Sequence, residues 1–214
     1  MSAMNISQTT SADKERTTTA KRTRPALSRI ALLIAPILLA ISTIFPFWSL
    51  TLHAPQYPGG LEVTVFTHKV TGDVSEVDGL NHYIGMMPLG DAASLERSIA
   101  TFAIVAFVVM GLLAALLRPR WTALLATPIV LFPFVFAADL FFWLYRAGHN
   151  LDPTAALSSS VKAFTPAIIG EGIVGQFSTT AFFGVGFFIA LAASILALVG
   201  IIARLRQKET GGAK

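Results

Sequence analysis

The sequence predicts an all-α integral membrane protein with four transmembrane helices and a small extracytoplasmic cap that contains a β-hairpin. Hydrophobic residues make up 54% of the 214 residues and charged residues only 13%, which lies outside the usual range of soluble domains. The apolar residues also gather in four runs, each long enough to cross a bilayer. These runs are residues 30–50, 99–117, 121–144 and 181–203.

Residues 1–29 precede the first run and are predicted to form a disordered, basic cytoplasmic tail. They are rich in Ser, Thr and charge and have no apolar period, so they cannot bury enough surface to fold. The run at 30–50 is interpreted as an uncleaved first helix. A cleavable signal peptide is the alternative, but the run is long for a signal core and no clear small-x-small cleavage site follows it.

The basic residues predict how these helices are oriented. Of the 16 Lys and Arg residues, only Lys69, Arg97, Arg146 and Lys162 lie in the two long loops between runs. The positive-inside rule therefore predicts a multi-pass protein of the inner cell membrane with both termini in the cytoplasm. Because topology explains the basic residues, the net charge of +4 does not indicate nucleic acid as a partner.

The remaining segments follow from this topology. Residues 51–98 and 145–180 form extracytoplasmic loops, residues 118–120 form a cytoplasmic turn, and residues 204–214 form a cytoplasmic tail. In the first loop, residues 61–65 and 74–77 alternate apolar and polar around Thr71-Gly72-Asp73. This pattern predicts a β-hairpin.

Candidate metal ligands lie in the same loops. The chain has no cysteine, which excludes disulfides and thiolate metal sites. His82 and Met86 are four residues apart, on one face of a helix if this segment is helical, and imidazole with thioether suits Cu(I). The candidate ligands of a transient Cu(I) are His82, Met86, Met87 and His149. The alternative is that His82 hydrogen-bonds the backbone and the methionines fill a gap beside lipid.

Two further features have structural interpretations. Asp139 is an ionisable residue near the outer end of the third run, where we expect a link to Arg146 rather than a proton or ion path. Residues 170–175 match the G-x-G-x-x-G pattern but lack the strand-helix context of a dinucleotide site, so nucleotide is not expected as a ligand. No catalytic motif is present, and we do not expect an enzyme.

Short segments of the two loops and of the end of the third run carry a resemblance. They are APQYP (54–58), LNHYIGM (80–86), DL (139–140), WLY (143–145), GH (148–149), LDP (151–153) and FTP (164–166). In these segments the chain resembles a family of small four-span membrane proteins associated with the gene clusters of nitrous-oxide reductase and its copper-handling accessory proteins. The resemblance covers most of residues 30–203 but not the basic N-terminal tail.

The resemblance implies a membrane accessory protein of a periplasmic copper enzyme of denitrification, acting in assembly, copper delivery or electron supply. It favours copper contact by His82 and Met86. The implied partners are membrane lipid and an extracytoplasmic or membrane protein of a copper or redox system. The alternative function is a structural anchor or scaffold subunit of a redox complex with no metal site of its own. A transporter or a quinol-reactive enzyme fits less well, because one intramembrane acid offers little for ion coupling.

Overall fold

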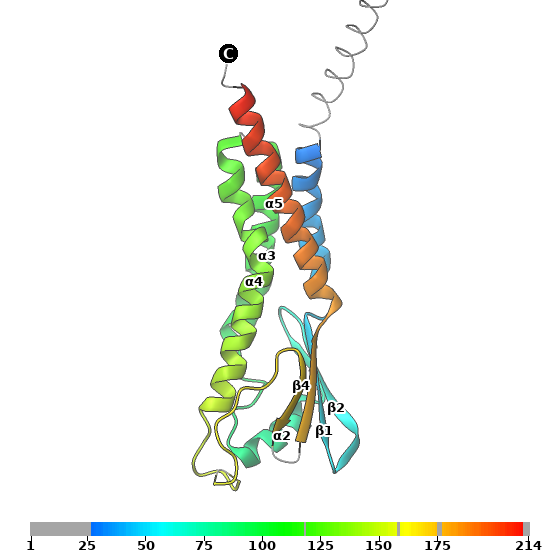
Figure 1. Ribbon diagram of the computed structural model, residues 1–214, viewed down its shortest axis with the longest axis vertical. Coiled ribbons are helices and arrows are strands. Elements are labelled where there is room, and N and C mark those ends of the chain that lie inside the picture. Colours follow the sequence, from blue (N-terminus) through cyan, green and yellow to red (C-terminus); the bar gives the residue numbers. More distant parts are fainter. Residues whose placement is uncertain (1–26, 118, 158, 175–176, 212–214) are drawn as a thin grey trace, which may run out of the picture.

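A computed structural model describes residues 27–117, 119–157, 159–174 and 177–211. The described chain has two parts, a bundle of helices at one end and an antiparallel sheet at the other (Figure 1). The predicted tail at residues 1–29 lies almost entirely outside the described residues. The first described residue and the end of the last helix both lie at the end of the bundle that points away from the sheet (Figure 1).

Three helices in the described chain are long and apolar enough to cross a membrane. They are α3 (Ser94–Leu116), α4 (Pro119–His149) and α5 (Val185–Gly211). A fourth apolar helix, Leu27–Ser42, lies beside α5 (Figure 1). At about 1.5 Å per residue it is only about 24 Å long, less than the roughly 30 Å of a hydrocarbon layer. The protein is therefore associated with a membrane through three candidate spans.

The prediction of four transmembrane helices and an all-α fold was wrong. The apolar run at 30–50 divides into a helix that ends at Ser42, a turn that includes Pro46, and a strand that begins at Trp48. Length and hydrophobicity do not separate a buried strand from a helix, so one continuous run concealed two elements. The run at 181–203 is divided in the same way, since Ala181 belongs to a strand and α5 begins at Val185.

The sheet has five strands, all paired antiparallel, in the order β3-β2-β1-β5-β4. The strands are β1 (Trp48–Ala54), β2 (Tyr57–Val65), β3 (Val70–Gly72), β4 (Gly170–Val174) and β5 (Phe177–Phe183). The pairing of Trp48 with Phe183 and of His53 with Ser178 joins the two long loops into one sheet. An isolated hairpin is only marginally stable in water, whereas a sheet of five strands with an apolar face has enough strands to be stable.

The predicted hairpin around Thr71-Gly72-Asp73 is also different in the structure. The tight hairpin joins β1 to β2, whereas Val74–Ile84 forms the helix α2. Val77, Asn81 and Ile84 are the buried residues of α2, and their spacing of four and three is the helical period. The segment 74–77 alternates apolar and polar, but four residues are about one helical turn and fit a strand and a helix equally well.

One face of the sheet packs against helices. Trp48, Leu50 and Val63 form a buried cluster with Val77 of α2 and Leu144 of α4. The Trp48 indole Nε1 donates a 2.7 Å hydrogen bond to the carbonyl of Ile168, which precedes β4. The lower part of α4 therefore extends beyond the bundle and holds the sheet in place.

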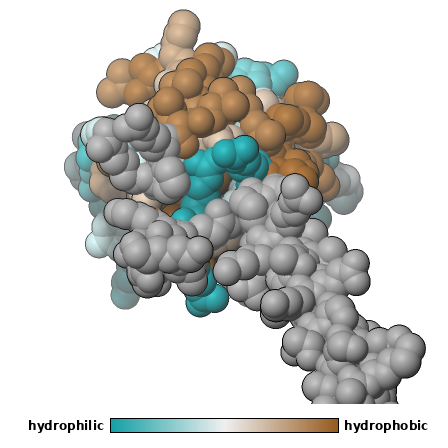
Figure 2. All heavy atoms as spheres, turned by 90° about the horizontal axis from the view of Figure 1, so that it is seen from above, coloured by the Kyte–Doolittle hydropathy of each residue, from teal (hydrophilic) through white to brown (hydrophobic). Residues whose placement is uncertain are grey.

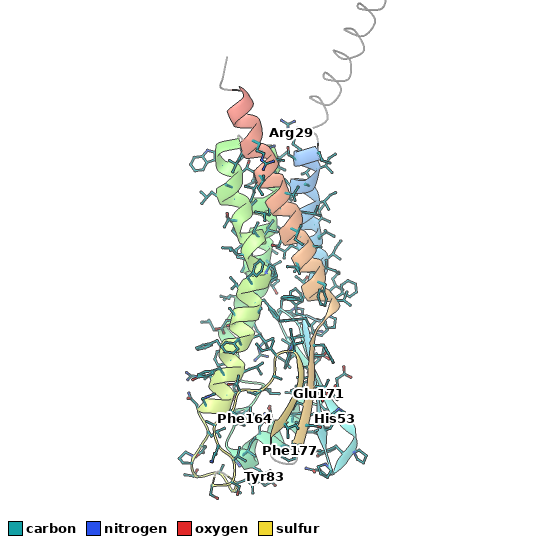
Figure 3. The ribbon with its side chains drawn as sticks, viewed as in Figure 1. Arg29, His53, Tyr83, Phe164, Glu171 and Phe177 are labelled. Atoms are coloured by element: carbon teal, nitrogen blue, oxygen red, sulfur yellow. The ribbon has the colours of Figure 1, made fainter. Side chains whose placement is uncertain are left out.

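The bundle has an apolar core, apolar sides and a polar end. Phe47 is fully buried against the rings of Phe132 and Phe136, at centroid distances of 5.9 and 4.9 Å. Viewed from the end away from the sheet, a group of hydrophilic side chains lies in the middle, beside a broad group of hydrophobic ones (Figure 2). Arg29 lies at this end, whereas His53 and Glu171 lie at the sheet end (Figure 3).

Candidate functional site

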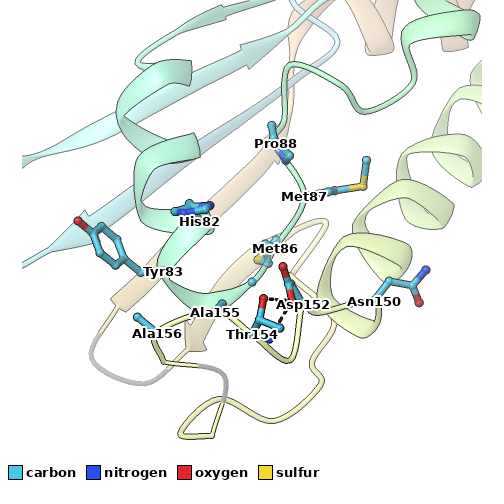
Figure 4. Close-up of a pocket in the computed structure, with 11 residues that line it drawn as sticks. His82, Tyr83, Met86, Met87, Pro88, Asn150, Asp152, Thr154, Ala155 and Ala156 are labelled. Carbon is cyan, nitrogen blue, oxygen red and sulfur yellow. Dashed lines mark hydrogen bonds between the residues drawn. The ribbon is translucent and has the colours of Figure 1, made fainter.

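A cavity of about 560 Å³ lies at the far end of the sheet domain, between the segment that follows α2 and the loop that follows α4 (Figure 4). We call it the outer cavity. Its chemically distinctive lining residues are His82, Met86, Met87, Asn150, Asp152 and Thr154. It therefore combines an imidazole, two thioethers and several oxygen atoms.

Gly85 brings the two segments of the outer cavity together. It ends α2 in the left-handed conformation with φ of 80°, and its carbonyl accepts a 2.8 Å hydrogen bond from the Asp152 N–H. A Cβ atom at this position would lie 2.6 Å from the Asp152 carbonyl oxygen. The Leu157 N–H also donates to the Tyr83 carbonyl over 2.9 Å. Only glycine satisfies both the backbone angle and the close approach.

The structure brings three of the four predicted ligands to this cavity but changes their geometry. His82 is exposed on the last turn of α2, while Met86 lies beyond the end of the helix, so the two do not share a helical face. Met87 extends toward α4 (Figure 4). His149 does not line the cavity; its ring stacks on Tyr145 at 3.9 Å, and its Nδ1 lies 3.0 Å from the Tyr145 carbonyl oxygen.

Asp152 supplies negative charge to the outer cavity. Its Oδ1 accepts hydrogen bonds from the Thr154 hydroxyl at 2.7 Å and from the Thr154 N–H at 2.8 Å. The hydroxyl bond, then the N–H bond and then the nearby His82 lower the pKa of the Asp152 carboxyl. No group of three or more His, Cys, Asp or Glu side chains with metal-site geometry occurs in the described part of the chain. A metal in the outer cavity would therefore depend on the thioethers.

A second cavity of about 340 Å³ lies between the sheet and the helices α3 and α4. We call it the inner chamber. Met86 and Met87 line both cavities, so they form the wall that the two share. Most of the inner chamber is apolar, and its polar or charged side chains, apart from the indoles of Trp48 and Trp143, are Thr67, Glu96, Arg97 and Asp139.

Asp139 faces the inner chamber and has an acidic neighbour. It interacts electrostatically with Glu96 of α3 and lies close to Trp143 of α4. The expected link between Asp139 and Arg146 does not form an ion pair in the structure, in which Arg146 is exposed. Sequence reasoning missed Glu96 and Trp143 as site residues. The available signals were the spacing of four between Asp139 and Trp143 and the position of Glu96 in the first turn of α3.

No protein-family model matches the chain, and no curated protein matches it either. These comparisons therefore do not support the resemblance to proteins of nitrous-oxide reductase gene clusters. The three apolar helices agree with a membrane protein but do not bear on copper or denitrification.

Proposed function

We propose that the protein is a membrane accessory protein that binds Cu(I) transiently in the outer cavity and passes it to an extracytoplasmic partner of a copper enzyme system. The observation that carries this proposal is that His82, Met86 and Met87 line a single cavity. Thioether and imidazole ligands favour soft Cu(I) over hard cations such as magnesium or calcium. The exposed position of His82 suits an ion that is received and released rather than stored.

The distribution of charge supports an extracytoplasmic position for this cavity. Arg29 lies at the end of the bundle away from the sheet, and Arg204 and Arg206 belong to the last turns of α5, which lie at the same end (Figure 3). In the sequence, Arg118 and Arg120 stand between the apolar runs of α3 and α4. By the positive-inside rule, that end faces the cytoplasm of a multi-pass inner membrane protein and the sheet domain faces the opposite side. All four histidines belong to elements of the sheet end or to the last turn of α4.

Titration of the full chain in detergent with Cu(I), in competition with a chromophoric Cu(I) chelator, tests this function. His82→Ala and Met86→Leu should each weaken Cu(I) binding by about tenfold or more, since each removes one of few ligands. His68→Ala is the matched control, because this exposed histidine lies in the turn between β2 and β3 and does not line the cavity. The metal function would be excluded if the wild type showed no measurable affinity for Cu(I). It would also be excluded if a variant that carries both His82→Ala and Met86→Leu bound Cu(I) as tightly as the wild type.

A scaffold subunit without a metal site is the second candidate, and the edge of the sheet favours it. β4 pairs with β5 on one side only, and Ile173 on this strand is 80% exposed. An unpaired edge strand with an exposed apolar side chain can accept a strand from a partner. Under this function, Ile173→Asp would abolish co-purification of a redox partner from membranes while His82→Ala would leave it intact. Under the metal function, partner loading with copper would instead depend on His82.

A further inference from the structure

The candidate span α3 is packed into the bundle only toward its C-terminal end. Its buried residues are Ile104, Gly111, Ala114 and Ala115, and none of its first ten residues is buried. A Cβ atom at Gly111 would lie 2.4 Å from Cδ1 of Ile129 on α4, which is closer than van der Waals contact. The inner chamber lies along the other half of α3, beside the sheet, where this close packing has ended.

The wall that α3 contributes to the chamber is a single helical face with small side chains. Ile99, Ala100, Ala103 and Phe107 line the chamber and are spaced as neighbours along one side of a helix. Two of these four residues are alanines, whose side chains leave the space between α3 and α4 unfilled. At the far end, the rings of Phe107 and Phe132 meet edge to face at 6.4 Å and close the chamber.

The chamber offers a ligand a mainly apolar surface. Glu96 Oε2 and Trp143 Nε1, at the end beside the sheet, are inaccessible to solvent, so they give a ligand no polar contact. Along α3 the lining runs from Glu96 to Phe107, which is eleven positions or about 16 Å. Half of a hydrocarbon layer of roughly 30 Å is about 15 Å. The chamber is therefore as long as the acyl region of one leaflet.

The chamber is open toward the bilayer. Ile99 of α3 and Val135 of α4 line it and are still 52% and 60% exposed, so its opening lies on the apolar flank of two candidate spans. Lipid chains are the molecules that adjoin this flank in a membrane. An apolar space that stayed empty would leave its lining side chains without dispersion contacts on one side.

We propose that the inner chamber binds one acyl chain of a phospholipid from the leaflet nearest the sheet. The chain ends against Phe107 and Phe132, and the glycerol and phosphate groups lie at the other end, which Thr67 and Arg97 line. This direction is the one that the chain already has in its leaflet, so the lipid enters sideways without turning over. A volume of about 340 Å³ is at the small end of the range for ligand sites and suits one chain. The second chain stays in the bilayer at the opening.

The bound chain completes packing that the polypeptide leaves open. Leu50 and Val63 of the sheet line the same chamber as Ala103 of α3, so one chain contacts both parts of the molecule. The phospholipid therefore joins the first half of α3 to the sheet domain. This inference goes beyond the proposed function and does not depend on copper binding in the outer cavity.

Native mass spectrometry of the full chain, released from nanodiscs of dioleoylphosphatidylcholine, tests the proposal. We expect one phospholipid to remain bound to the wild type. Ala103→Phe places a ring in the chamber and should weaken phospholipid binding by about tenfold or more. Ala106→Phe is the matched control and should retain the lipid, because this alanine is exposed on the same helix and does not line the chamber.

Two results of this experiment would overturn the proposal. One is equal retention of phospholipid in the wild type, in Ala106→Phe and in a correctly folded Ala103→Phe. The other is a free fatty acid, in place of a phospholipid, on the protein purified from membranes.

Tryptophan fluorescence is a second measurement that requires no substitution in the chamber. Trp48 and Trp143 line the chamber, and Trp121 lies at the other end of α4, so all the emission of Trp121→Phe comes from chamber residues. Trp48 is only 3% exposed, which keeps the surrounding lipid away from its ring. Phosphatidylcholine brominated on its acyl chains should quench this emission and saturate at a low mole fraction. Quenching that rises only in proportion to the mole fraction would contradict a binding site.

Discussion

Arg204 of α5 donates from Nη1 to the hydroxyl oxygen of Thr122 of α4 over 3.2 Å. The same guanidinium donates to the carbonyls of Ala114 at 3.2 Å, Leu117 at 2.8 Å and Ala115 at 2.6 Å. These carbonyls belong to the C-terminal end of α3, where no helical N–H groups remain to satisfy them. Although it is charged, Arg204 is only 4% exposed. It thus joins three helices and places a cation at the negative end of the α3 dipole.

Replacement of Arg204 by Met should destabilise the bundle. The thioether fills much of the same space but leaves the α3 carbonyls without their donor, and each buried acceptor without a partner costs about 1–3 kcal/mol. We therefore expect a loss of at least about 2 kcal/mol, seen as a lower midpoint of thermal unfolding in detergent. Arg146→Met is the control, since Arg146 is exposed at the other end of α4.

A double-mutant cycle identifies the contact with Thr122. Thr122→Val keeps the volume of this fully buried side chain but removes the hydroxyl, which also donates to the Ala114 carbonyl at 3.3 Å. If the two side chains cooperate, Arg204→Met with Thr122→Val should cost less than the sum of the single changes by about 1 kcal/mol. Strict additivity would show that the two residues act independently.

Gly79 inside α2 and Gly85 at its C-terminal cap should respond in opposite ways to substitution by alanine. Gly85→Ala places a Cβ at a φ of 80° and 2.6 Å from the Asp152 carbonyl, so we expect a loss of about 1–2 kcal/mol or more and a distorted outer cavity. Gly79→Ala lies inside the helix with open space around it, and it should stabilise by about 0.5–1 kcal/mol. Thermal unfolding of both variants measures the difference, and a shift of the same sign in both would contradict the role of Gly85.

Hydrophobic runs predicted the helices well where each run contained a single element. The runs at 99–117 and 121–144 became α3 and α4, with boundaries extended at one or both ends. They failed where a helix continued into a buried strand, as at Pro46, because Trp48, Leu50 and Leu52 are apolar enough to resemble a further helical turn. The pairing of β1 with β5 joins segments more than a hundred residues apart, and no local pattern reports such a contact.

The same limit applies to the two cavities, because the sequence predicts contacts between neighbouring residues but not contacts between distant segments. His82, Met86 and Met87 are neighbours in sequence, so their proximity could be predicted, whereas the loop that carries Asp152 could not be placed beside them. The inner chamber was not predicted at all. Its polar end joins Glu96 of α3 to Asp139 and Trp143 of α4. The apolar residues around them have the same composition as an ordinary membrane helix.

The Thr154 hydroxyl should hold Asp152 ionised in acid. This bond is the main cause of the lowered pKa of Asp152, so Thr154→Val should raise that pKa toward the ordinary aspartate value of 3.8. A lowered folded-state pKa means that the carboxylate stabilises the loop fully above about pH 4 and loses this effect as the pH falls through the folded-state value. Carbon-13 NMR titration of labelled aspartate carboxyl groups measures the change. Thr180→Val on β5 is the control and should leave the Asp152 titration unchanged, whereas an unchanged titration in Thr154→Val would assign the shift to the backbone N–H instead.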